Sequence, residues 1–365
     1  MISEIKREYI WLDSFKLPLK KKQKLIEFCG GIKKVSDCIH TFKSGLENII
    51  SLETISYMQG ALRKEYIEEK IDRILSLGIE VTTIEDDNYP RLLREISDPP
   101  LVLYTIGDAS ILNKKCLAVV GTRQATSYGR EVALSFSKTL SKTELVLVSG
   151  LAYGIDTCVA QAVLETGKPT VAVMGGGLDK IYPAQNSDVA RRIVETGGVL
   201  VSEYPPDVGP NKSSFLERNR IISGLSLGVL VVEAGLHSGA ESTANDCVLE
   251  GRSLFVIPGN ITSAASAGCN RLLVSWPQAI CTDPSEILKE LNISEPAKLA
   301  TGKRQFSIEE SLVIDALSEE RSIDEIAEIS KLDTQTLLTV LSRLEIGGII
   351  KRTNGNYYAK ITLQF

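Results

Sequence analysis

The chain has 365 residues, of which 43% are hydrophobic and 24% charged, a composition typical of a globular protein with two or three domains. Its formal net charge of −5 excludes a protein that coats nucleic acid through bulk positive charge, so any nucleic-acid site has to be a local basic patch. Seven scattered cysteines, never spaced as C-x-x-C, and only two histidines argue against disulfides, a zinc site and a histidine relay.

The N-terminus and the apolar runs bear on localisation. No apolar run reaches the roughly 20 residues that a membrane span needs. The first ten residues mix both charge signs, and no apolar signal core with a small-residue cleavage site follows them. We therefore expect a cytoplasmic protein with reduced thiols and no membrane insertion.

Residues 1–77 predict a helical N-terminal domain. Residues 21–29 are rich in lysine on one face, and apolar residues recur at helical spacing in 62–77. Gly30 and Gly31 permit a turn between two helices that could touch backbone phosphates, but the glycine signature of a helix-hairpin-helix is missing, which favours a plain helical cap. Residues 78–107 follow as a connector, with apolar stretches at 80–84 and 101–106, that packs on the next domain.

Between residues 115 and 291, six apolar β-branched runs are each followed by Gly or Pro and then by a helical stretch. Continuously apolar strands indicate a sheet buried on both faces, and strand–glycine–helix repeats indicate parallel βαβ units. We therefore predict an α/β fold, an extended Rossmann-like doubly wound parallel sheet, over residues 78–292. The runs are 117–120, 145–148, 170–174, 199–202, 229–232 and 254–257.

Residues 293–305 look like a linker, and residues 306–365 predict a C-terminal winged-helix domain. Ser322 and Glu325 form a capping box, and Asp333 starts the next helix. Gly347-Gly348 ends that helix, and an Asn354-Gly355 turn separates two short strands, 349–352 and 357–360.

In open α/β sheets, ligands bind at the carboxyl ends of the strands, so the residues after each strand define a candidate rim. Four of the six segments are rich in glycine, which suits an oxyanion, and no histidine is expected at this rim. Neither G-x-G-x-x-G nor a Walker A lysine is present, so we expect no cofactor. The glycines at 175–177 fit a tight turn and a ligand contact equally well. The segments are Gly121-Thr122-Arg123, 149–156, 175–179, 202–204, Glu233-Ala234 and Pro258-Gly259.

The segment 211–225 carries the most specific pattern of the chain. Within ten residues it combines three cations, an asparagine and an aromatic ring, namely Lys212, Phe215, Arg218, Asn219 and Arg220. Single-stranded nucleic acid needs cations for its phosphates and a flat face for a splayed base. The alternative is that the ring belongs to the core and the arginines form ion pairs on a helix, and composition leaves both open.

Short motifs run in order along residues 78–291, and together they resemble the DprA (DNA-processing protein A, or Smf) family. The departures are Val159-Ala160, where the family has Ala-His, Leu216, where it has Pro, and Glu241, which would repel phosphate if it faced the rim. The matching motifs are Tyr89-Pro90, Leu93, Asp98-Pro99-Pro100, Leu103-Tyr104, 120–123, 127–129, 149–152, 154–156, 177–179, Tyr182-Pro183, Asn186, 202–205, Phe215, 218–222, Gly224-Leu225, Glu233-Ala234, Ser238-Gly239, Pro258-Gly259, Gly268 and Asn270.

The resemblance implies a non-enzymatic protein that binds incoming single-stranded DNA during natural transformation, protects it and helps to load the RecA recombinase. It also implies a homodimer formed through the Rossmann domain, a helical (SAM-like) N-terminal domain and no cofactor or metal. The predicted DNA-binding residues are Gly121, Arg123, Ser149, Gly150, Lys212, Phe215, Arg218, Asn219, Arg220, Ser238 and Gly239.

Other functions remain open. A nucleotide-processing enzyme like the lysine-decarboxylase-like (LOG) phosphoribohydrolases would use Glu233, but the Gly-Gly-x-Gly-Thr loop is absent. Asp156 and Glu203 are further acid–base candidates, for which we favour helix capping or pairing with the arginines. The same fold could serve DNA repair or phage defence. A transcription regulator is disfavoured, because residues 306–365 contain ten acidic and six basic residues.

Overall fold

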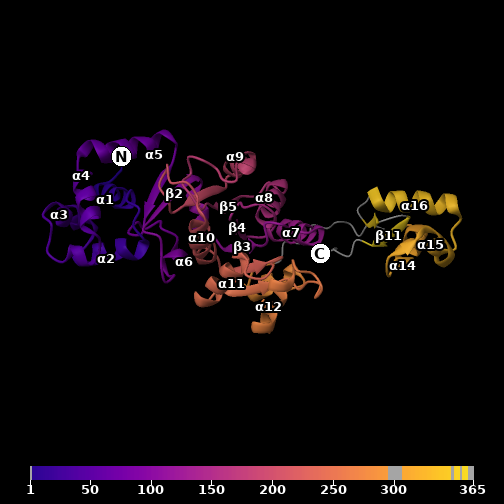
Figure 1. Ribbon diagram of the computed structural model, residues 1–365. Helices are drawn as coiled ribbons and strands as arrows, with labels where there is room; N and C mark the ends of the chain where they lie inside the picture. The colour runs from indigo at the N-terminus through magenta and orange to yellow at the C-terminus, as the bar shows by residue number, and fades with distance from the viewer. Residues whose placement is uncertain (1, 295–305, 347–348, 354–355, 361–365) are drawn as a thin grey trace. The chain divides into compact units, whose positions relative to one another are not determined.

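The computed structural model describes residues 2–294, 306–346, 349–353 and 356–360 (Figure 1). The chain divides into two compact units, Met1–Glu295 and Pro296–Phe365. The predicted linker, 293–305, lies almost entirely outside the described residues. The domain boundaries stay predictions, and each unit is described by itself.

The first unit is built on a mixed sheet of eight strands in the order β1-β2-β6-β5-β4-β3-β7-β8. The six strands from β3 to β8 are parallel and correspond to the six predicted apolar runs, which confirms the predicted α/β fold class. The predicted connector instead extends the sheet, because β2 pairs antiparallel with both β6 and β1. The strands are β1 (Glu80–Thr83), β2 (Val102–Gly107), β3 (Cys116–Val120), β4 (Val146–Ser149), β5 (Thr170–Val173), β6 (Val199–Ser202), β7 (Gly228–Val231) and β8 (Ser253–Val256).

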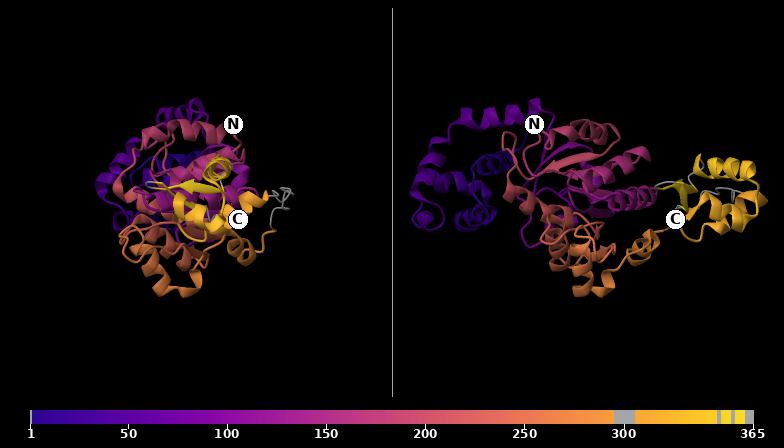
Figure 2. Two further views of the ribbon diagram at one scale, coloured as in Figure 1. Left: turned by 90° about the vertical axis from the view of Figure 1, so that its right-hand side faces the viewer. Right: turned by 45° about the vertical axis from the view of Figure 1, so that its right-hand side comes forward.

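Helices cover both faces of the sheet, as Figure 2 shows. In β3, Leu117 and Val119 pack on one face while Ala118 and Val120 pack on the other, so the strand has no solvent side. The first face carries α7 (Ser127–Leu140), α8 (Ile155–Glu165), α9 (Ser187–Glu195) and α13 (Pro284–Glu290). The second carries α6 (Arg91–Arg94), α10 (Lys212–Gly224), α11 (Gly239–Leu249) and α12 (Ala267–Ser275).

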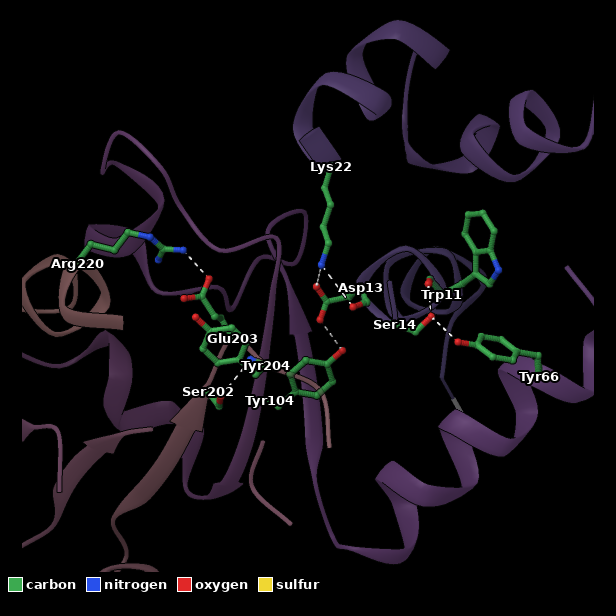
Figure 3. A network of polar contacts seen from close by, with 10 residues as sticks. All are labelled: Trp11, Asp13, Ser14, Lys22, Tyr66, Tyr104, Ser202, Glu203, Tyr204 and Arg220. Atoms are coloured by element: carbon green, nitrogen blue, oxygen red, sulfur yellow. Dashed lines mark hydrogen bonds and ion pairs between the residues drawn. The ribbon is translucent and has the colours of Figure 1, made fainter. Parts of the chain in front are cut away.

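The N-terminal helices share a hydrophobic core with β1 and β2. A polar network joins them to the sheet: the buried Lys22 ammonium lies 2.6 Å from the Asp13 carboxylate, which also accepts a hydrogen bond from Tyr104 at 2.9 Å (Figure 3). A buried ammonium is tolerated only when paired in this way. The helices are α1 (Glu4–Asp13), α2 (Leu19–Cys29), α3 (Val35–His40), α4 (Leu52–Gly60) and α5 (Lys64–Ser76), and the 3-10 helices of the unit are η1 (Ile32–Lys34), η2 (Leu46–Asn48), η3 (Ala109–Asn113), η4 (Ala184–Asn186) and η5 (Pro277–Ala279).

The second unit is a winged helix with its own core around Val313, Leu337 and Leu341. The predicted capping box at Ser322 and Glu325 is present. The predicted helix end at 347–348 and turn at 354–355 lie outside the described residues. Its elements are α14 (Ile308–Ala316), β9 (Arg321–Ser322), α15 (Ile323–Ser330), α16 (Thr334–Ile346), β10 (Ile350–Arg352) and β11 (Tyr357–Lys360). In the described part of the chain, no helix is both long and apolar enough to cross a membrane.

Candidate functional site

The sheet changes direction at β3, whose neighbours are β4 on one side and β7 on the other. Crossover helices leave such a point in opposite directions, so a crevice opens at the carboxyl ends of the two strands. A cleft of about 810 Å³ lies there, lined by residues 120–124, by α10 and by the start of α11. The candidate site is therefore where the topology predicts it.

The cleft collects eight of the eleven predicted DNA-binding residues. Ser149, the last residue of β4, and Gly150, which follows it, are buried outside its lining, and Arg220 lies on another side of α10. The eight that line it are Gly121, Arg123, Lys212, Phe215, Arg218, Asn219, Ser238 and Gly239.

Two exposed cations stand in the cleft. Arg123 lies in the loop between β3 and α7. This loop is held in place because the Thr122 amide donates a hydrogen bond to the Glu233 carbonyl at 2.7 Å. Lys212 opens α10, where Asn211 forms a capping box with Ser214. Neither Arg123 nor Lys212 has a carboxylate within ion-pair distance in the part of the chain that the structure describes, so both charges are available to an anionic ligand.

An aromatic platform lies beside these cations. The half-buried Phe215 ring has the Arg123 guanidinium 4.9 Å from its centroid and the Tyr182 ring 5.6 Å away, tilted by 46°. Phe215 packs on the backbone of Gly175, where a Cβ atom would come within 2.8 Å of the ring. The neighbouring glycines are crowded by the 205–210 segment, so the glycines at 175–177 serve close protein packing.

Arg218 is buried, with 3% of its surface exposed, and its contacts are structural. Its guanidinium donates to the Gly150 carbonyl at 2.8 Å and to the Val173 carbonyl, which ties α10 to the ends of β4 and β5. A Cβ atom at Gly150 would lie 2.5 Å from this guanidinium. Burial lowers the pKa of Arg218 to about 10, which still leaves the group protonated at neutral pH. Arg218 therefore positions Phe215 one turn earlier on α10.

Arg220 lies away from the cleft and pairs with Glu203 at 2.5 Å (Figure 3). From α10, residues 212, 215, 216, 218, 219 and 222 line the cleft, whereas 220 does not. Burial raises the pKa of Glu203, and the Arg220 charge opposes that shift. The ion-pair interpretation of this arginine agrees with the geometry, and its DNA contact stays a prediction.

The start of α11 completes the rim. Ser238 caps the helix, and Asn219 donates to the Gly239 carbonyl at 3.1 Å, which holds α10 and α11 together. Glu241 is buried and pairs with Arg271 at 2.5 Å, while its other oxygen accepts the Ser238 amide. The charge of Glu241 is thereby neutralised and does not face the rim. The repulsion of phosphate by Glu241 that the sequence suggested is therefore not expected.

His237 and Tyr182 are among the cleft residues that were not predicted to bind DNA. His237 is exposed, adopts a φ of 57° and lines the cleft beside Ser238, so the expectation of a rim without histidine was wrong. Tyr182, which is 49% exposed, also lines it. The available signal for His237 was its place three residues after Glu233-Ala234, just before the start of a helix.

The carboxylates considered for acid–base chemistry all have structural partners. Glu233 is buried and accepts hydrogen bonds from the Thr126 amide at 2.9 Å and hydroxyl at 2.6 Å. Asp156 accepts the amides of Gly150 and Ala152, and burial raises its pKa. Among the described residues, no group of three or more His, Cys, Asp or Glu side chains could hold a metal ion.

Comparison with known proteins finds matches along both units. The family model of DNA recombination-mediator protein A matches residues 80–292, and that of the DprA winged helix domain matches 297–356. Protein Smf of Escherichia coli is 35% identical over 75% of this chain and 75% of its own length. The DNA processing protein DprA of Bacillus subtilis is 36% identical over 67% of this chain and 86% of its own.

Two solved structures are similar to this one. The X-ray structure of DprA from Streptococcus pneumoniae has a TM-score of 0.67 at 30% identity, covering 80% of this chain and 99% of that one. DprA from Helicobacter pylori, whose structure addresses its single-stranded DNA binding mode, has a TM-score of 0.52 at 31% identity, covering 58% and 96%.

Proposed function

Since the chain belongs to the family of DNA recombination-mediator protein A, or DprA, we propose that its cleft binds single-stranded DNA with little sequence preference and without chemical turnover. The observation that carries this proposal is the pairing of the Phe215 ring with the exposed cations Arg123 and Lys212 in one open cleft. Cations hold phosphates of any sequence, and an aromatic face stacks on any base. The H. pylori relative, described for single-stranded DNA binding, supports the same class of ligand.

The preference for single strands follows from the platform. A duplex keeps its bases stacked on each other, so it offers nothing to Phe215, whereas stacking of a splayed base contributes roughly 1–3 kcal/mol. We propose that this binding serves natural transformation in the cytoplasm, where the protein protects incoming strands and helps to load RecA. We further propose a homodimer, which would place two clefts on one particle. Light scattering at a protein concentration of tens of micromolar tests for this dimer.

The test is an anisotropy titration with matched single-stranded and duplex oligonucleotides over a salt series. Single strands should bind more tightly, and Arg123→Glu with Lys212→Glu should weaken binding to all sequences alike. The salt slope should flatten by about 0.7 for each phosphate that the variant no longer neutralises. The control is Lys142→Glu with Lys168→Glu, which changes the net charge equally at two exposed sites outside the cleft. Equal affinity for duplex and single strand would refute the proposal.

A nucleotide-processing enzyme is the competing function, which the position of Glu233 does not favour. Glu233, its candidate carboxylate, is held by Thr126 and does not line the cleft. We expect AMP and labelled oligonucleotides to stay intact on incubation with the protein. Release of free base that disappears in Glu233→Ala would favour the enzyme instead.

A further inference from the structure

One short segment outside the cleft has a large excess of positive over negative charge. Residues 16–43 contain eight lysines and only two acidic residues, Glu27 and Asp37, so they carry a formal charge of +6 within a chain of −5. The remainder of the chain therefore carries −11. Such a segregated basic stretch creates a local field that attracts polyanions.

Seven of the eight lysines are exposed and form what we call the basic N-terminal face. The exception is Lys22, which points inward to Asp13 (Figure 3). Within the described residues, Asp98 at 3.7 Å from Lys20 is the one carboxylate in ion-pair range of the face. The face consists of Lys16, Lys20, Lys21, Lys24, Lys33, Lys34 and Lys43.

Part of this face is a stripe along α2. Lys22, Leu25 and Cys29 are buried, which leaves Lys21 and Lys24 on the opposite, solvent side at a spacing of roughly 5–6 Å. The first turn of α2 holds no acidic residue, and its N-cap, Pro18, makes no side-chain hydrogen bond. Cations in the first turn oppose the helix dipole. Local helix stability therefore does not explain these lysines, which favours a role in binding.

The stripe continues beyond the end of α2. Gly30 and Gly31, with φ of 78° and 118°, reverse the chain and bring Lys33 and Lys34 to this end of the helix. The Lys43 ammonium donates to the Phe28 carbonyl at 3.0 Å and lies 4.6 Å from the centroid of the Phe28 ring. The cations therefore extend along the whole helix.

The basic N-terminal face adjoins the cleft through the loop before α10. Lys16 and Lys20 line a hollow of about 680 Å³ together with residues 208, 209 and 211. Residues 210–212 line the cleft itself. The hollow also contains five acidic side chains, each of which has a partner. Four form ion pairs, Asp13 with Lys22, Asp98 with Lys20, Glu203 with Arg220 and Asp207 with Arg73, and Glu217 accepts a hydrogen bond from Tyr204. A strand that leaves the cleft over this loop thus meets cations next.

We propose that the basic N-terminal face binds the phosphodiester backbone of the single strand where it leaves the cleft, extending the binding site onto α2 and the turn after it. The inference rests on the proposed function of the cleft. It assigns phosphate contacts to lysines, which bind as mobile point charges and read no sequence. Affinity should therefore depend on the length of the strand.

The test uses the full chain with Lys21, Lys24, Lys33 and Lys34 all changed to Glu. On a single strand of about 30 nucleotides, we expect affinity to fall at least tenfold, with a salt slope flatter by about two to three units. On a strand of about six nucleotides, which fills the cleft alone, affinity should stay within twofold of wild type. The matched control changes four exposed lysines elsewhere in the same unit to Glu, namely Lys114, Lys142, Lys168 and Lys289.

Equal affinity of the quadruple variant and its control for the long strand overturns the inference. So does an equal loss on both lengths, because the face would then not be an extension of the cleft. The variant with Arg123→Glu and Lys212→Glu, measured in parallel on the short strand, reports on the cleft separately. If this cleft variant no longer binds the short strand, the proposed function stands even when the inference about the basic N-terminal face fails. If it binds the short strand as wild type does, both the proposed function and the inference are overturned.

Discussion

Arg218→Met separates a residue that positions the site from one that contacts the ligand. In the wild type, the buried guanidinium satisfies the carbonyls of Gly150 and Val173. Methionine fills a similar volume but donates no hydrogen bond, so two buried acceptors lose their partner at a cost of roughly 1–3 kcal/mol each. Removing a buried charge returns part of that cost. We expect the free energy of unfolding to fall by about 2–4 kcal/mol.

The assay combines denaturant unfolding with anisotropy on a single strand. Arg218→Met should lose both stability and affinity, because α10 and Phe215 shift when the Arg218 guanidinium is removed. Arg123→Met is the matched comparison: its side chain is exposed, so stability should change by less than about 0.5 kcal/mol while affinity falls. Unchanged stability of Arg218→Met together with weaker binding would contradict the reasoning, since Arg218 would then act on DNA directly.

Two further predictions concern charges outside the cleft. Glu241→Gln releases Arg271 and weakens the capping box with Ser238, so thermal unfolding should show a loss of about 1 kcal/mol, while single-strand affinity stays within twofold because this carboxylate does not face the cleft. A clear gain in affinity would show that its charge does reach the ligand. Lys351→Glu with Arg352→Glu in the winged helix should leave single-strand affinity within about threefold, less than 1 kcal/mol, because acidic residues dominate that unit. A tenfold loss in the same titration would make the wing part of the DNA site.

The parallel core of the fold could be predicted because its strands are apolar on both faces. Runs such as 117–120 and 229–232 have no polar face, and only a sheet covered on both sides accommodates them. The antiparallel addition of β1 and β2 could not be predicted, because short apolar stretches beside prolines do not specify their pairing partner. That information lies in the contact of β2 with β6, about a hundred residues later.

The candidate site was predictable by position but not by side chain. Arg218 and Arg220 stand two residues apart in one cationic cluster, and nothing in the sequence distinguishes their roles. Their separation depends on which side of α10 packs against β4 and β5, which tertiary contacts decide. His237 was missed because it stands between the two predicted segments Glu233-Ala234 and Ser238-Gly239 and outside the cationic cluster, although the loop carries it into the same cleft.

The buried guanidinium of Arg218 also limits the shape of ligand that the fold can hold. Doubly wound sheets commonly seat a nucleotide cofactor against the glycines after their strands. Here the Arg218 side chain occupies the corresponding position at the ends of β4 and β5, and it covers Gly150. What stays open is the cleft lined by residues 120–124, by α10 and by the start of α11. A small molecule would find little enclosure there, whereas a polymer could enter and leave without an end being threaded.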